Sequence, residues 1–111
     1  MNERSLAAAM APSFWAAAIW AGHFAVIYGF TAWACARGLT RTEWLGAGIV
    51  TWVVAAATGL AVVAAASLIA RSCRRGRLRE FTGWLGAALA VLVLVAVIWE
   101  AAPVLLLPPC G

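Results

Sequence analysis

Charged residues divide the chain into three long apolar runs. No charged residue occurs from Ser5 to Ala36, from Trp44 to Ala70, or from Phe81 to Trp99. A helix needs about 20 apolar residues to cross a hydrocarbon core of roughly 30 Å. The pattern therefore predicts three membrane-spanning helices, over residues 13–36, 45–70 and 81–99.

Strands do not fit these runs. The runs are rich in Ala and Leu, and an open three-stranded sheet would leave backbone groups unpaired in lipid. We therefore predict an all-α membrane protein with a single domain over residues 1–111. The connections at 37–43 and 71–80 are short, which predicts an up-down-up bundle.

Local signals place the helix ends. Pro12 and Ser13 suit the start of the first helix, and Thr42 with Glu43 suits the start of the second. Prolines break the apolar tail at residues 100–111, which we expect to lie at the membrane surface or against a partner.

Composition supports a chain dissolved in a bilayer. Of its 111 residues, 66% are hydrophobic and 11% are charged, and the mean hydropathy is +0.96. Soluble domains carry about 25% charged residues, so these charges are too few to cover a water-facing surface. The first apolar run is too long for a secretory leader, and we interpret it as an uncleaved anchor.

The arginines are distributed unevenly between the two ends of the predicted bundle. One end holds Arg4, Arg71, Arg74, Arg75, Arg77 and Arg79, whereas the other holds Arg37 and Arg41. The positive-inside rule then predicts a cytoplasmic N-terminus and a periplasmic C-terminus in a bacterial inner membrane. The arginines from 71 to 79 are expected to attract anionic lipids. Nucleic acid is not an expected partner, because the arginines lie in the gaps between apolar runs.

A row of small residues follows the first predicted helix. Its members, three or four residues apart, are Ala18, Gly22, Ala25, Gly29 and Ala32. Such rows let helix backbones approach closely in lipid. The row either packs within the chain or forms a docking face for a larger membrane partner.

His23 is the polar exception in the first predicted span. Ionisable groups at bilayer depth are costly and are functional candidates. A neutral ring could donate a hydrogen bond to Thr58, at matching depth, or bond to a partner subunit. It could also lie near a haem or quinone of a partner, or ligate haem in a symmetric dimer. A proton relay is the weakest interpretation, because no predicted span contains Asp or Glu.

The cysteines and the last acid lie near predicted boundaries. Cys35, Cys73 and Cys110 form no CxxC motif, so no metal site is expected within the chain. The predicted orientation places Cys35 and Cys110 outside, where a disulfide persists; two free thiols are the alternative. Glu100 marks the predicted end of the third helix. We expect it to be solvated, to pair with Arg37 or Arg41, or to contact a partner's periplasmic domain.

Signals of catalysis are missing from the sequence. The chain has no Asp, no Gly-rich phosphate loop and no carboxylate pair for acid–base chemistry. We therefore expect no independent enzymatic activity.

In size, number of spans and orientation, the chain resembles the small accessory subunits of bacterial haem–copper terminal oxidases, with subunit IV of quinol and caa3-type oxidases closest in layout. The run from Trp20 through His23 to Tyr28, with Cys35 and the terminal Pro-Pro-Cys, is similar to small membrane proteins encoded beside oxidase genes. The resemblance implies a non-catalytic subunit that stabilises a large subunit, with no cofactor of its own and haem or quinone in its partners. The alternative is a small homo-oligomeric transporter or channel with His23 at a midplane site.

Overall fold

The computed structural model describes residues 3–39, 43–108 and 110. These residues form three long helices, namely α1 (Glu3–Arg37), α2 (Ile49–Arg74) and α3 (Phe81–Leu106). A hairpin of β1 (Glu43–Trp44) and β2 (Ala47–Gly48) precedes α2, and a 3-10 helix, η2 (Arg77–Arg79), precedes α3. Each of the three helices is long and apolar enough to span a membrane, so the prediction of an all-α fold with three helices of spanning length is confirmed.

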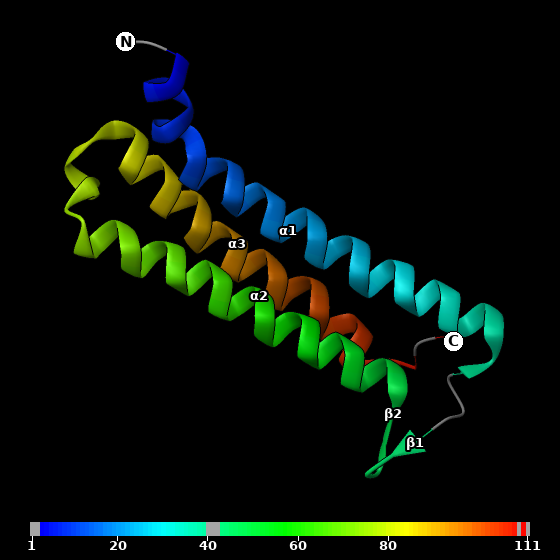
Figure 1. Cartoon of the computed structure of the whole chain (residues 1–111). Coiled ribbons are helices and arrows are strands. Elements are labelled where there is room, and N and C mark those ends of the chain that lie inside the picture. The colour runs from blue at the N-terminus through cyan, green and yellow to red at the C-terminus, as the bar shows by residue number, and fades with distance from the viewer. Residues whose placement is uncertain (1–2, 40–42, 109, 111) are drawn as a thin grey trace.

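The three helices run antiparallel to their neighbours in sequence. Figure 1 shows the N-terminus and the α2–α3 connection at one end of the bundle, and the hairpin and the C-terminus at the other. We call these the arginine end and the hairpin end. α3 packs against both other helices, whereas α1 and α2 contact each other less.

The start of α1 differs from the prediction. The helix begins at Glu3 and not at residue 13, and it contains Pro12. The alanine-rich segment before Pro12 has high helix propensity, so the missing proline N–H bends the helix without ending it. Figure 1 shows the first turns of α1 set at an angle to the rest.

The hairpin displaces the start of α2 from the predicted residue 45 to Ile49. Leu45 and Gly46 form its two-residue turn with φ of 53° and 82°, and positive φ at both positions matches the twist of a tight hairpin. The Trp52 indole N–H donates to the Trp44 carbonyl at 2.7 Å, which ties the hairpin to α2. Glu43 thus belongs to a strand; Thr42 and Arg41 lie outside the described residues. α2 ends at Arg74 instead of residue 70.

α3 begins at Phe81 as predicted but extends beyond residue 99. It continues through Glu100 and Pro103 to Leu106, so most of the predicted tail at 100–111 is helical. A proline inside a helix removes one amide donor. The apolar residues around Pro103 remain in the bundle, and that packing keeps the helix intact.

The core consists of two apolar clusters, one toward each end. The cluster nearer the arginine end comprises Ala16, Ala61, Ala65, Val93 and Val97. The cluster nearer the hairpin end comprises Ile27, Ala34, Val50, Val54 and Ala101. On each helix, successive members of the two clusters lie four, seven or eleven residues apart, close to whole numbers of helical turns, so they share one face. A polar layer lies between the two clusters.

Candidate functional site

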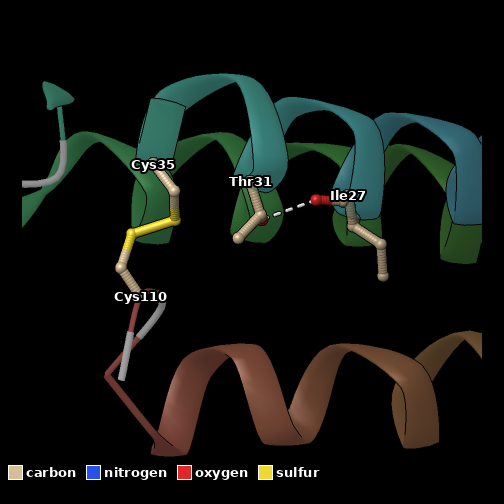
Figure 2. The surroundings of a disulfide bond; sticks show 4 residues. All are labelled: Ile27, Thr31, Cys35 and Cys110. Carbon is tan, nitrogen blue, oxygen red and sulfur yellow. Dashed lines mark hydrogen bonds between the residues drawn. A yellow bond between two sulfur atoms is a disulfide. The ribbon is translucent and has the colours of Figure 1, made fainter. Parts of the chain in front are cut away.

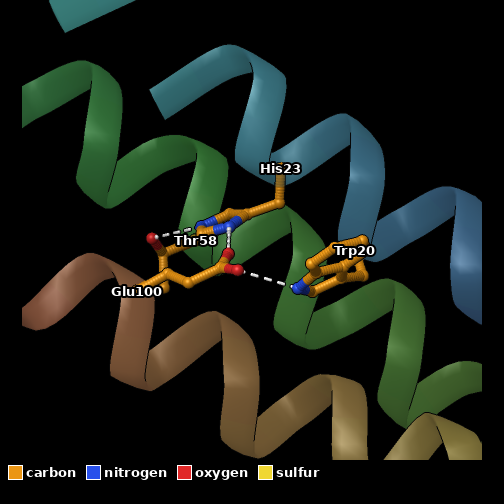
Figure 3. Close-up of polar contacts among 4 residues, drawn as sticks. All are labelled: Trp20, His23, Thr58 and Glu100. Carbon is orange, nitrogen blue, oxygen red and sulfur yellow. Dashed lines mark hydrogen bonds and ion pairs between the residues drawn. The ribbon is translucent and has the colours of Figure 1, made fainter. Parts of the chain in front are cut away.

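The polar layer joins all three helices through four side chains. His23 of α1 has its Nε2 3.0 Å from Thr58 Oγ1 of α2 and its Nδ1 3.3 Å from Glu100 Oε2 of α3. The Trp20 indole N–H donates to Glu100 Oε1 at 2.7 Å. Figure 3 shows the four side chains converging between the helices. We call this group the polar cluster.

The local sequence explains why these side chains meet. On α1, His23 occupies the row between Ala16 and Ile27; on α3, Glu100 lies beside the buried Ala101. The side chain of His23 is 1% exposed and that of Glu100 is 15% exposed. Facing lipid, either group would lack a polar partner. Burial against one another satisfies both.

The cluster lies on the hairpin side of the middle of α2 and of the middle of α3. Thr58 is nine residues from the start of α2 and Glu100 six from the end of α3. These spacings correspond to about 14 and 9 Å along the helix axes. The cluster thus lies in the half of α2 and of α3 that is nearer the hairpin end.

Glu100 changes the proton assignment expected for His23. An ionised Glu100 accepts from Nδ1–H, so a neutral ring has a bare Nε2 that accepts from the Thr58 hydroxyl. The donation to Thr58 expected from the sequence corresponds to the other neutral tautomer, whose bare Nδ1 would accept from a protonated Glu100. A protonated ring donates from both nitrogens, and the Thr58 hydroxyl then turns to accept.

Two of the roles expected for Glu100, a solvated helix terminus and a pair with Arg37, are wrong, and Arg41 lies outside the described residues. Glu100 is neither a helix terminus nor paired with Arg37, because α3 continues past it and its two oxygens face Trp20 and His23. The absence of an acid from every span, which argued against a proton relay, is overturned as well. Within the described part of the chain, the four members of the cluster bond to one another and to no further side chain.

The order hydroxyl, imidazole, carboxylate is also that of hydrolase triads. Acyl transfer further requires donors aimed at an oxyanion. The backbone amides beside Thr58 are engaged in the hydrogen bonds of α2. Here the three side chains come from three different helices, so their hydrogen bonds cross-link the bundle. Among the described residues, no three His, Cys, Asp or Glu side chains gather to hold a metal ion.

Cys35 and Cys110 form a disulfide at the hairpin end, the pairing considered from the sequence. Their Cα atoms are 5.8 Å apart across a sequence separation of 75. Figure 2 shows the bond joining the last turns of α1 to the segment after α3, in line with Thr31 and Ile27 on the same helix. Cys73, at the arginine end, is free and exposed. The disulfide thus fixes the end of the chain to α1.

The row of small residues lies on the opposite face of α1 from the polar cluster. Ala18, Gly22, Ala25, Gly29 and Ala32 are all exposed. A Cβ added at Gly22 or Gly29 would meet no neighbouring atom within 4 Å. The alternative of packing within the chain is therefore wrong for this row. Other small residues do pack within the bundle, and on α3 these include Gly83, Gly86, Ala87 and Ala90.

The arginines gather at the arginine end. Arg71 and Arg74 lie in the last turn of α2, Arg75 follows it, and Arg77 and Arg79 bound η2. Arg71, Arg74, Arg75 and Arg79 are exposed. Basic residues at a helix C-terminus interact favourably with the helix dipole.

Sequence reasoning missed two members of the cluster, Trp20 and Glu100. The signal for Trp20 was present in the sequence, because Trp20 lies three residues before His23 and therefore on the same helix face.

Comparisons with protein-family models, with curated proteins and with solved structures give no match to this chain.

Proposed function

We propose that this chain is a non-catalytic membrane subunit that packs against a larger integral-membrane protein through α1. The observation that carries the proposal is the two-faced character of this helix. His23 and Trp20 find partners inside the bundle, whereas the exposed row of small residues faces outward. Such a row lets a partner helix approach closely in lipid.

The resemblance in layout to accessory subunits of haem–copper oxidases suggests the partner to test first. Under this proposal the chain stabilises a large subunit of a respiratory complex in the bacterial inner membrane. Haem or quinone would belong to the partner subunits. His23 then serves the bundle itself, because both of its ring nitrogens have partners within the chain.

Two independent features favour a cytoplasmic N-terminus. Arginines gather at the arginine end, which the positive-inside rule assigns to the cytoplasm. The Cys35–Cys110 disulfide lies at the other end, and disulfides persist in the periplasm.

Purification of the tagged chain from its native membrane in mild detergent tests the proposal. We expect large membrane subunits and haem absorbance to accompany it. The double variant Ala25→Leu/Gly29→Leu should lose these partners, since it fills the exposed row without touching the core. The matched control Ala56→Leu/Ala70→Leu, at exposed positions of α2, should retain them. Purification as a homo-oligomer without haem, or equal retention by both variants, would contradict the proposal.

The His23–Glu100 pair favours one second candidate, a homo-oligomeric transporter or channel. An ionisable pair inside a span is typical of ion and proton pathways. Reconstitution of the chain alone in vesicles separates the candidates. Proton flux that disappears in both His23→Ala and Glu100→Gln would favour transport over the subunit proposal.

A further inference from the structure

A groove between α1 and α2 opens at the arginine end. Its mouth has a volume of about 200 Å³ and is lined by Pro12 and Trp15 of α1, by Leu68, Arg71 and Ser72 of α2, and by Arg75. The groove exists because α1 and α2 contact each other less than either contacts α3.

Beyond its mouth, the groove continues along the bundle between α1 and α2 and is lined mainly by apolar side chains. A second stretch of about 380 Å³ shares Trp15, Leu68 and Arg71 with the mouth and reaches Ile19 and Ala64. A third, of about 310 Å³, shares Ile19 and Ala64 and reaches Ala57. From Arg71 to Ala57 is about 21 Å along α2. One leaflet of the hydrocarbon core is roughly 15 Å thick, so the groove is long enough for an acyl chain of that leaflet.

The mouth of the groove is polar and cationic. Arg71 and Arg75 are exposed, and neither forms an ion pair within the described part of the chain. Ser72 is 4% exposed and lines the mouth between them. Arginine guanidinium groups match the oxygens of a phosphate. Two cations without an ion-pair partner at the mouth of a long apolar groove favour an anionic, amphipathic ligand.

We propose that this groove binds one anionic phospholipid. The phosphate lies between Arg71 and Arg75, and one acyl chain follows Ile19 and Ala64 toward the centre of the bundle. Basic pockets between membrane helices bind anionic headgroups in this way. The site goes beyond the diffuse attraction expected of the arginines, because it assigns the ligand to two of them. It is also independent of any partner protein.

A lipid titration followed by native mass spectrometry tests the site. The delipidated full chain in detergent is titrated with phosphatidylglycerol or phosphatidylcholine carrying the same acyl chains. We compare Arg71→Gln/Arg75→Gln with Arg74→Gln/Arg79→Gln, which removes the same charge outside the groove. The first should weaken phosphatidylglycerol binding at least about tenfold, and the second less than about twofold. Helix content by circular dichroism and an intact disulfide establish that each variant is folded.

A second pair of variants tests the apolar part of the groove. Ala64→Phe fills it, whereas Ala66→Phe adds the same volume at an exposed position of α2. Only Ala64→Phe should reduce phosphatidylglycerol binding. Equal losses in the two arginine variants would overturn the site in favour of diffuse attraction. No preference for the anionic lipid, or unchanged binding by Ala64→Phe, would also overturn it.

Discussion

His23 and Glu100 are 77 residues apart in the sequence, and their Nδ1 and Oε2 atoms are 3.3 Å apart in the structure. Their contact fixes α1 to α3 in the layer between the two apolar clusters. Thr58 extends the link to α2 through the other ring nitrogen. One imidazole thus connects three helices, so the registration of the bundle depends on polar side chains as well as on apolar packing.

Replacement of Glu100 should destabilise the bundle. Glu100→Leu leaves Trp20 and His23 without their acceptor, and we expect the free energy of unfolding to fall by about 1–3 kcal/mol. Glu100→Gln, which keeps an acceptor and a donor, should cost less. Unfolding in detergent, followed by circular dichroism, measures both. Glu80→Leu, at an exposed acid, is the control, and an equal loss in Glu80→Leu and Glu100→Leu would contradict the structural role of the pair.

The indole of Trp20 has its own measurable contribution. Trp20→Phe keeps an aromatic ring but removes the N–H that donates to Glu100. Hydrogen bonds to charged groups contribute about 1.5–3 kcal/mol, and we expect a loss of unfolding free energy near the lower value because Trp20 is partly exposed. Trp84→Phe, on the exposed surface of α3, should change little. If the two variants unfold alike, the indole bond does not stabilise the bundle.

The helices could be predicted from the sequence because long apolar runs between charges have few other solutions. The face of α1 that packs inward could not be predicted from the sequence. Its small residues and its buried residues both recur at three or four positions, and the two rows lie on opposite faces. Ala18 is two residues from Ala16, about 200° around the helix. Spacing alone therefore does not identify the buried row. The buried row is identified by His23, whose ring nitrogens need hydrogen-bond partners inside the bundle.

The end of α3 shows a second limit of sequence reasoning. Glu100 and Pro103 are both signals of a helix end, and together they predicted a tail. In the structure, each has a compensation that lies far away in the sequence. Glu100 has partners on α1, and the segment around Pro103 packs in the bundle through Ala101. Such long-range compensation is not visible in a local pattern.

At Gly86, α3 packs tightly against Pro12 of α1. A Cβ added there would lie 2.7 Å from Pro12 Cβ. The rigid proline ring cannot move aside easily, so the two helix backbones would have to separate. Gly86→Ala should therefore lower the unfolding free energy by about 1–3 kcal/mol. Gly59→Ala, where an added Cβ meets nothing within 4 Å, should be neutral or slightly stabilising in the same unfolding assay. A neutral Gly86→Ala would contradict the close approach at Pro12.

The disulfide predicts how many of the three cysteines react with a thiol reagent before and after reduction. In the absence of reductant, maleimide should label Cys73 alone in the solubilised chain, whereas all three cysteines should react after reduction. Mass spectrometry of the labelled protein distinguishes these states. Reduction should also lower the unfolding free energy by about 2–4 kcal/mol, because it releases the tail from α1. Labelling of Cys35 or Cys110 before reduction would contradict the bond.

The proposed orientation of the bundle predicts on which side of the membrane each end lies. With the arginine end in the cytoplasm, a phosphatase that folds only in the periplasm should be active when fused after Gly111, and a fluorescent protein that folds only in the cytoplasm should be dark there. The same reporters inserted at the α2–α3 connection should give the opposite result. Because the arginine bias sets the orientation, Arg71→Gln/Arg74→Gln/Arg75→Gln should shift a fraction of the chains to the inverted state. A cytoplasmic signal after Gly111 in the unaltered chain would refute the orientation, and it would also place the disulfide in a reducing compartment, where it does not persist.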